Sequence, residues 1–319
     1  MIRTAKLLLI AASITISALA HAQTWPDQPI RWVVPYPPGG GTDIVARSVA
    51  STMEKSLNQP IVIENRPGAG TSIGATAVAQ AKPNGYMVGT ADSGTLAFNP
   101  ALYSTLTYDP AVFTYIGGLA RFPLMLAVRH DSPLKSVEDV LAAAKKKSLS
   151  VSSAGAGSPH HLAMELFKQR TGADLLHVPY QGAAPAIQDL IGGQVDMMFI
   201  DGAAGLPNVR AGKLRVLATA TPERLAAVPD APTMVEKGYP GFTAYAWQGL
   251  VGPAGLPANV VDRLSKELVA ALQTPALVEK ITNMGVEPMP MSSDEFKAHA
   301  EKERALWADV INKAGIKLD

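Results

Sequence analysis

Glycine-rich turns that follow apolar strands and open helices are the features of this sequence best suited to chemistry. The clearest runs from Val33 to Asp43 and reads VVPYPPGGGTD. Its glycines let the backbone come close to a bound group, and the helix behind them aims unpaired N–H groups at the same place. Because a helix N-terminus carries about half a positive charge, the turn predicts a site for a small anion, with a carboxylate expected first. The alternative is an ordinary strand–helix turn in which Thr42 or Asp43 caps the helix.

A second turn of the same design runs from Ser152 to His161 and reads SSAGAGSPHH. Ser158 is placed to cap the following helix, with Pro159 at its first position. Ligands of doubly wound sheets bind at the carboxyl ends of strands. The two turns, facing each other across a cleft, would therefore hold one anion from both sides. Turn formation alone is again the alternative, and we expect Ser158 to cap the helix in either case.

Other polar and aromatic residues follow predicted strands or lie in turns. The hydroxyl of Ser93 is expected to donate to a ligand rather than to attack one. Asp201 could pair with an ammonium group or accept from a hydroxyl, but we prefer the interpretation that it caps the next helix. Tyr36, Tyr180 and Trp247 are equally compatible with a cleft wall and with ordinary packing.

The sequence gives little support for catalysis, metal binding or nucleotide binding. His160, His161 and Glu165 invite a metal interpretation, but a metal site needs three or four ligands and no further cluster stands out. We therefore expect His161 to be hydrogen-bonded near the ligand or in the core. The chain has no cysteine and no Gly-x-Ser-x-Gly elbow. The loop at 68–74 lacks dinucleotide spacing and no Walker pattern occurs, so no cofactor, metal or enzymatic activity is expected.

The first residues have the pattern of a secretory signal peptide. Arg3 and Lys6 precede an apolar stretch over 7–19, and the small-x-small rule predicts cleavage after Ala22. Removal of residues 1–22 leaves 26 basic and 27 acidic residues. This balance argues against a nucleic-acid partner. We expect a soluble protein exported to the periplasm, without disulfides and without a lipid anchored through cysteine.

Strand-like and helix-like segments alternate along the chain, which is typical of a parallel sheet with crossover helices. The apolar stretches predict strands over 30–34, 61–63, 86–90, 124–128, 149–153, 175–178, 195–200, 214–219 and 249–252. The length favours two domains. We expect residues 23–122 plus 247–319 to form one doubly wound lobe and residues 123–246 a second, in a monomer.

Short segments in nearly every part of the chain together resemble the substrate-binding proteins of tripartite tricarboxylate transporters, also called the Bug family. They are 25–30, 35–43, 64–70, 82–86, 99–103, 157–162, 178–182, 192–196 and 211–215. The resemblance implies a periplasmic-binding-protein (Venus flytrap) fold that holds a carboxylate between the turns at 35–43 and 153–161. The ligand-binding residues that we predict on this basis are Tyr36, Gly40, Gly41, Thr42, Asp43, Ser93, Thr95, Ser153, Gly157, Ser158, His161, Tyr180 and Asp201.

The resemblance further implies that the protein delivers its ligand to the permease subunits of such a transporter. Two other functions stay open at this point. The protein could present its ligand to a membrane sensor, or it could be an exported hydrolase on a two-lobed scaffold. Dicarboxylates, tricarboxylates, aromatic acids and amino acids are all compatible with the predicted site.

Overall fold

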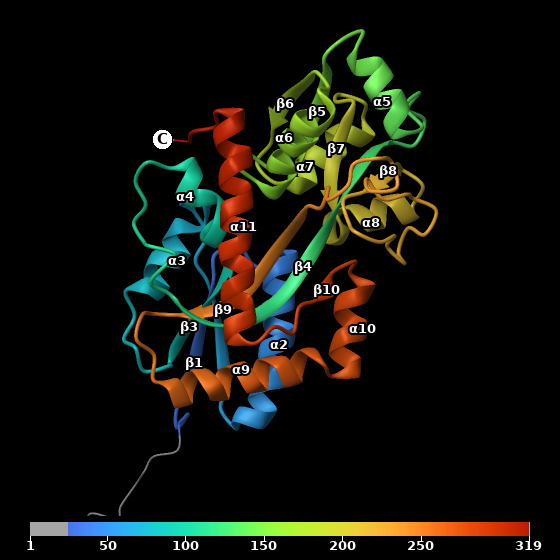
Figure 1. Ribbon diagram of the computed structural model, residues 1–319. Helices are drawn as coiled ribbons and strands as arrows, with labels where there is room; N and C mark the ends of the chain where they lie inside the picture. The colour runs from blue at the N-terminus through green and yellow to red at the C-terminus, as the bar shows by residue number, and fades with distance from the viewer. Residues whose placement is uncertain (1–24, 319) are drawn as a thin grey trace, which may run out of the picture.

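The computed structural model describes residues 25–318, which form two α/β lobes joined by extended strands (Figure 1). The two-lobed α/β architecture expected from the sequence is confirmed. The predicted signal peptide, residues 1–22, lies outside the described residues. Within residues 25–318, no helix combines the length and the apolar character that a membrane span requires.

The first lobe contains the N-terminal strands and returns at the C-terminus. Its strands are β1 (Ile30–Val34), β2 (Ile61–Asn65), β3 (Met87–Asp92), β9 (Tyr245–Gly252) and β10 (Glu287–Pro288). Its helices are α2 (Gly41–Leu57), η1 (Ala69–Thr71), α3 (Ser72–Ala79), η2 (Gly94–Phe98), α4 (Asn99–Leu102), α9 (Ala258–Leu272), α10 (Pro275–Asn283) and α11 (Ser293–Ala314). Strand β1 pairs in parallel with β2 and β3, whereas β9 is antiparallel to β3.

The second lobe is built from the middle of the chain. Its strands are β5 (Leu149–Ser153), β6 (Leu175–Pro179), β7 (Met197–Asp201) and β8 (Leu214–Thr219). Its helices are α5 (Val137–Ala144), α6 (Pro159–Thr171), α7 (Ala183–Ile191) and α8 (Gly202–Arg210). Strand β5 pairs in parallel with both β6 and β7.

A single long strand, β4 (Thr114–Arg129), runs through both lobes (Figure 1). Up to Pro123 it pairs with β9 and β10, and from Leu124 onward it pairs with β7 and β8. Both sheets are therefore mixed, because β4 is antiparallel to all four partners, and the predicted parallel sheet is found only in part. The chain passes between the lobes along β4 and returns along β9.

The sequence predicted only the segment 124–128 of this strand, because glycine and proline interrupt the pattern before it. The glycines are required by close backbone contacts. A Cβ atom at Gly117 would lie 2.7 Å from the carbonyl oxygen of Met291, and one at Gly118 would lie 2.6 Å from that of Met289. The register also shifts at these glycines, as in β-bulges.

Helices form where the sequence combines an apolar face with a capping residue. In α9, Leu264, Leu268 and Leu272 recur at steps of four and are all buried, each contributing about 1.5–3 kcal/mol by burial. Helix α11 begins with a capping box in which Ser292 accepts from the Glu295 N–H and the Glu295 side chain accepts from the Ser292 N–H.

Three apolar clusters cover the faces of the two sheets. The largest extends through both lobes and includes Trp247 of β9 and Phe296 and Trp307 of α11. Helix α11 also reaches the second lobe, where Gln169 Nε2 of α6 donates to the Val310 carbonyl oxygen at 2.8 Å. The long C-terminal helix thus braces β4 and β9 and touches both lobes (Figure 1).

We predict that Gly249→Ala destabilises the protein by about 1–3 kcal/mol, because a Cβ atom at this position of β9 would lie 2.1 Å from Phe296 Cζ. Urea-induced unfolding measures the change. Gly192→Ala is the control, since its Cβ would meet no atom closer than 3.4 Å and its φ is −71°. Equal stability of the two variants would contradict the packing argument.

Candidate functional site

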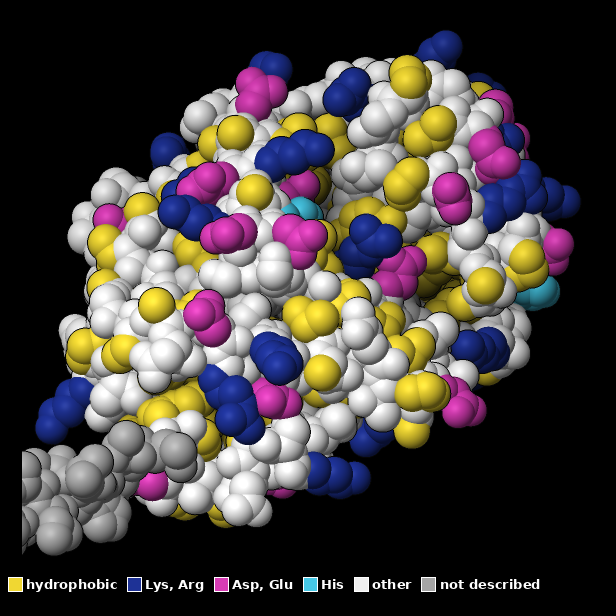
Figure 2. Space-filling view, turned by 60° about the horizontal axis from the view of Figure 1, so that its bottom comes forward, with side chains coloured by type: hydrophobic (Ala, Val, Ile, Leu, Met, Phe, Trp, Pro, Cys, Tyr) yellow, Lys and Arg dark blue, Asp and Glu magenta, His cyan; other side chains and the backbone are white. Residues whose placement is uncertain are grey.

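A cavity of about 980 Å³ lies between the lobes, a size typical of small-molecule sites. Both glycine-rich turns line it, one from each lobe. On the face shown in Figure 2, apolar side chains lie in a hollow, and basic and acidic side chains are interspersed over the surrounding surface. Of the thirteen predicted ligand-binding residues, those that line the cavity are Tyr36, Gly40, Gly41, Thr42, Gly157, Ser158 and Asp201.

The first turn connects β1 to α2 and leaves the helix end open. Gly39 has φ +85°, which favours glycine, and Gly40 is the N-cap with no side-chain hydrogen bond. The interpretation of Thr42 or Asp43 as the N-cap is therefore wrong. Without a side-chain cap, the first amides of α2 keep their N–H groups available to a ligand. Gly41 lies in a narrow place, because its Cβ would be 3.2 Å from Phe122 and 3.4 Å from Ala203.

Asp43 does not line the cavity, but its side chain stabilises the first turn through hydrogen bonds. Its carboxylate is buried and accepts from the Gly39 N–H at 2.9 Å, from Arg47 Nε at 2.9 Å and from Asn65 Nδ2 at 2.8 Å. Burial alone would raise the pKa of Asp43, but the hydrogen bonds from Arg47, Gly39 and Asn65 outweigh it and lower the pKa. The ionised carboxylate thus fixes the loop that places the open amides.

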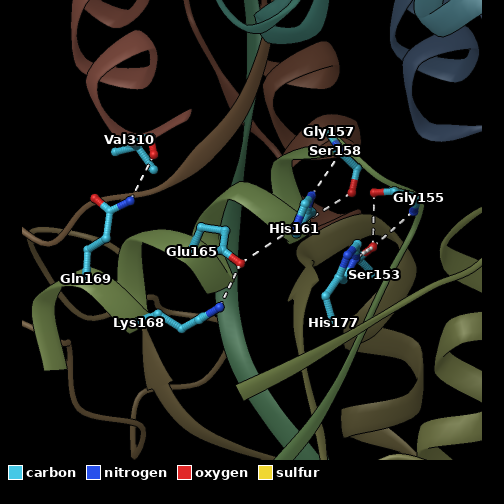
Figure 3. Close-up of polar contacts among 10 residues, drawn as sticks. All are labelled: Ser153, Gly155, Gly157, Ser158, His161, Glu165, Lys168, Gln169, His177 and Val310. Carbon is cyan, nitrogen blue, oxygen red and sulfur yellow. Dashed lines mark hydrogen bonds and ion pairs between the residues drawn. The ribbon is translucent and has the colours of Figure 1, made fainter. Parts of the chain in front are cut away.

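The second turn connects β5 to α6 and is held by histidines (Figure 3). Ser158 caps α6, as predicted, by accepting from the His161 N–H at 3.3 Å. His161 Nδ1 accepts from the Gly157 N–H at 3.0 Å, so the imidazole ring stabilises the backbone of the turn. Ser153 donates to the Gly155 carbonyl oxygen at 3.0 Å and lies 2.6 Å from His177 Nε2. Ser153 and His161 therefore support the turn and do not line the cavity.

His161 and His177 stack, with ring centroids 3.6 Å apart and an interplanar angle of 6° (Figure 3). Burial, the neighbouring His177 and Lys168 lower the pKa of His161 to about 3. Burial and Lys168 lower the pKa of His177 to about 4. Glu165, with Oε1 at 3.8 Å from His161 Nε2, is the acidic group beside the stack. Both rings are consequently neutral at neutral pH, and the turn depends on their neutral form.

The remaining predicted residues occupy different places. Thr95 is buried behind the lining, where its hydroxyl donates to Asp92 Oδ1 at 2.8 Å and lies 2.8 Å from Thr71 Oγ1. Ser93 is buried, and its hydroxyl has no hydrogen-bond partner within residues 25–318. Tyr180 points elsewhere and donates to Asp189 Oδ2 at 2.6 Å, which with burial raises the pKa of Tyr180 to about 12.

Asp201 lines the cavity and also caps α8, as the sequence interpretation preferred. It accepts from the Ala204 N–H at 2.9 Å and lies 3.1 Å from His160 Nε2. Burial raises the pKa of Asp201, but His160 and the backbone N–H groups outweigh it, and the net effect lowers the pKa. Tyr36 lines the cavity and donates to Asp92 Oδ2, and burial together with Asp92 raises its pKa.

The sequence did not single out several lining residues. They are Thr71, Asp92, Phe122, Gln248, Met284 and Leu318, among others, and His160, which the sequence suggested only as a metal ligand, also lines the cavity. Trp247, for which a cleft wall and a packing role were equally open, does line the cavity. Among residues 25–318, no group of three or more metal-ligating side chains is arranged to hold a metal ion.

We predict that Ser158→Ala lowers the free energy of unfolding by about 1 kcal/mol, because the His161 N–H loses its acceptor. Ser158→Asn is the matched control, since asparagine also caps helices well. Urea unfolding of both variants without added ligand separates capping from ligand contact. An unchanged stability in Ser158→Ala would show that the cap contributes nothing.

We predict that stability falls as the pH is lowered from about 6.5 toward 4. In the unfolded chain both histidines take up a proton near pH 6.5, whereas in the folded protein they do so only near pH 3 and 4. The unfolded state therefore binds more protons in this window, so the stability is complete above pH 6.5 and decreases as the pH drops. Unfolding free energies measured across the window test this.

His177→Gln should reduce the pH dependence, because one of the two depressed groups is removed. His130→Gln is the control, since His130 is exposed and lies outside the stack. Identical pH dependence in all three proteins would contradict the assignment.

Three comparisons place the chain among known proteins. The family described as "Tripartite tricarboxylate transporter family receptor" matches residues 45–316. Protein BugT of Bordetella pertussis is 35% identical over 317 residues, which cover 97% of this chain and 96% of BugT.

Two solved structures of similar proteins contain ligands. A protein of R. palustris solved with adipate matches with a TM-score of 0.84 and 35% sequence identity. The match covers 92% of this chain and 100% of the R. palustris chain. MatC from Rhodopseudomonas palustris, solved with bound malate, matches with a TM-score of 0.79 and 34% sequence identity. This match covers 90% of this chain and 100% of the MatC chain. These matches confirm the predicted periplasmic-binding-protein fold. The chain belongs to the receptor family of tripartite tricarboxylate transporters, a family of periplasmic solute-binding proteins that includes the Bug proteins.

Proposed function

We propose that this chain is a periplasmic solute-binding protein that captures a small organic carboxylate between its lobes and delivers it to a tripartite tricarboxylate-type permease. The observation that carries the proposal is the pair of strand–turn–helix junctions, one from each lobe, that line one cavity. Export by the predicted signal peptide is part of the proposal. Adipate and malate in the two similar structures support a carboxylate as the ligand class.

The proposed contacts use backbone amides and hydroxyls rather than a buried cation. The open N-terminus of α2 offers amides around Gly40, Gly41 and Thr42. The second turn offers the Ser158 hydroxyl; Gly157 also lines the cavity, but its N–H already donates to His161 Nδ1. Hydrogen bonds from such groups to a desolvated carboxylate are charge-assisted, and each contributes about 1.5–3 kcal/mol. Asp43, Thr95, Ser153 and His161 are proposed to position these groups without touching the ligand.

The proposed lobes are residues 23–122 plus 247–319 and residues 123–246. The change of pairing partners on β4 between Pro123 and Leu124 supports this division. Because each lobe supplies one turn, only a state with both turns at the ligand completes the hydrogen bonds. Binding therefore favours one arrangement of the lobes, which is the arrangement that a permease would distinguish from the empty protein.

The test is a thermal-shift and calorimetry screen of small carboxylates, adipate and malate included, against the mature protein. A ligand at a hundredfold excess over its Kd stabilises the folded state by about 2.7 kcal/mol. We predict that Gly40→Val weakens binding at least tenfold, whereas the loss of the glycine N-cap costs the free protein about 1 kcal/mol or less. The nearest atom to a Cβ at Gly40 is 3.9 Å away, and its φ of −77° suits valine, so the added methyl groups extend into the cavity.

Gly192→Val, which lies outside the cavity, is the control for adding a β-branched side chain. Wild-type affinity in Gly40→Val would refute the role of the first turn. Loss of ligand uptake in cells that keep the permease but lack this chain would test delivery.

A further inference from the structure

The side-chain amide of Gln248 is a buried polar group without a partner. Gln248 is 1% exposed and lines the cavity, and neither Nε2 nor Oε1 has a hydrogen-bond partner among residues 25–318. Buried amides in native proteins are almost always paired, because an unpaired donor or acceptor keeps its full desolvation penalty. The Nε2 group of Gln248, which donates, and its Oε1, which accepts, therefore remain to be satisfied at the cavity.

A carboxylate lies next to this amide in the first lobe. Asp92 of β3 is the direct cross-strand neighbour of Gln248 on β9, and both line the cavity. Asp92 is 8% exposed and accepts hydrogen bonds from the Tyr36 hydroxyl and from the Thr95 N–H and hydroxyl. This part of the cavity wall is consequently rich in acceptors.

The second lobe contributes a similar pair. Asp201 and His160 both line the cavity, and His160 Nε2 is directed at Asp201 Oδ2 at 3.1 Å. His160 is 7% exposed, and its Nδ1 has no hydrogen-bond partner in the described part of the chain. When the ring is neutral and its proton faces Asp201, Nδ1 is an acceptor. Each lobe thus places one of these carboxylates and one side chain with an unpartnered polar group at the cavity.

Positive charge on the cavity wall is sparse. Among the described residues that line it, Arg210 is the single lysine or arginine, and its exposed guanidinium donates to the Asn283 carbonyl oxygen at 3.4 Å. The helix N-termini can compensate one carboxylate of a ligand. A second carboxylate would meet Asp92 and Asp201, and like charges in a poorly solvated cavity repel strongly.

We infer that the ligand is a carboxylate whose other polar end carries N–H donors, an ammonium or carboxamide group, rather than a second carboxylate. This inference rests on the proposed function and narrows its ligand class. The acceptors for these N–H groups would be Gln248 Oε1, the carboxylate of Asp92 or Asp201, or His160 Nδ1. A carboxamide would also offer an oxygen to Gln248 Nε2.

Calorimetry with matched acids tests the ligand class on the full mature chain. The first set consists of glutarate, its monoamide and δ-aminovalerate, and the second consists of adipate, its monoamide and ε-aminocaproate. The third set is the pair glutamine and glutamate. In at least one set, the acid with an N–H-bearing end should bind at least tenfold tighter than its dicarboxylate counterpart. Comparison of monoamide with amino acid then separates a carboxamide from an ammonium group.

Equal or tighter binding of the dicarboxylates would overturn this inference and leave the proposed function intact. Failure of every carboxylate to bind would overturn the proposed function and this inference with it. The two failures are therefore distinguishable in one data set.

Gln248→Leu separates ligand recognition from packing. Leucine removes two unsatisfied polar atoms at similar volume, so the free protein should be as stable as wild type or more stable. Affinity for the preferred acid should fall at least tenfold. Gln273→Leu, at an exposed position, is the control. A less stable free protein with unchanged affinity would assign Gln248 to packing and overturn its role.

Asp92→Asn and Asp201→Asn test the two carboxylates. Asparagine keeps the shape, and at position 201 it also keeps the capacity to cap α8. Each variant should reduce the preference for the N–H-bearing acid over the dicarboxylate at least fivefold. Asp309→Asn, at an exposed position of α11, is the control and should leave the preference unchanged. An unchanged preference in both variants would overturn the assignment of the carboxylates to selectivity.

Discussion

Both lobes depend on the pairing of β4 with β9, because these two strands carry the chain from one lobe to the other. The exchange of partners on β4 takes place at Pro123, which has no N–H to donate, and at Leu124, whose N–H donates to Ala244. Phe122 and Gln248 of the same two strands line the cavity. The backbone that joins the lobes is therefore also a wall of the site, so a ligand in contact with Gln248 touches the connection directly.

The proposed anion site, built from helix N-termini, would explain why so many predicted residues lie one layer behind the cavity. Amides attract an anion only if the turns that display them keep their shape. Asp43 fixes the first turn through Gly39, and the neutral ring of His161 fixes the second through Gly157. The chemistry of these side chains is used on the protein itself, which leaves the glycine backbone to face the ligand.

The sequence predicted what is local and missed what depends on pairing between distant segments. The caps at Ser158 and Asp201 follow from residues next to each other in the chain, and the structure confirms both. The extent of β4 could not be predicted, because its glycines are explained by backbone contacts with Met289 and Met291, far along the chain. Tyr180 follows a strand as Tyr36 does, yet Asp189 in the next helix binds its hydroxyl.

The same reasoning explains why Gln248 had no sequence signal and why His160 suggested only a metal interpretation. A glutamine in an apolar strand is inconspicuous until its neighbours on both sides are known, and only then does the lack of a partner have meaning. An unpaired amide lowers the stability of the empty protein, and a ligand that supplies the partners removes that cost. A replacement that stabilises the empty protein would thus weaken binding. Under the proposal, stability and affinity are opposed at Gln248, whereas the Ser158 cap would contribute to both.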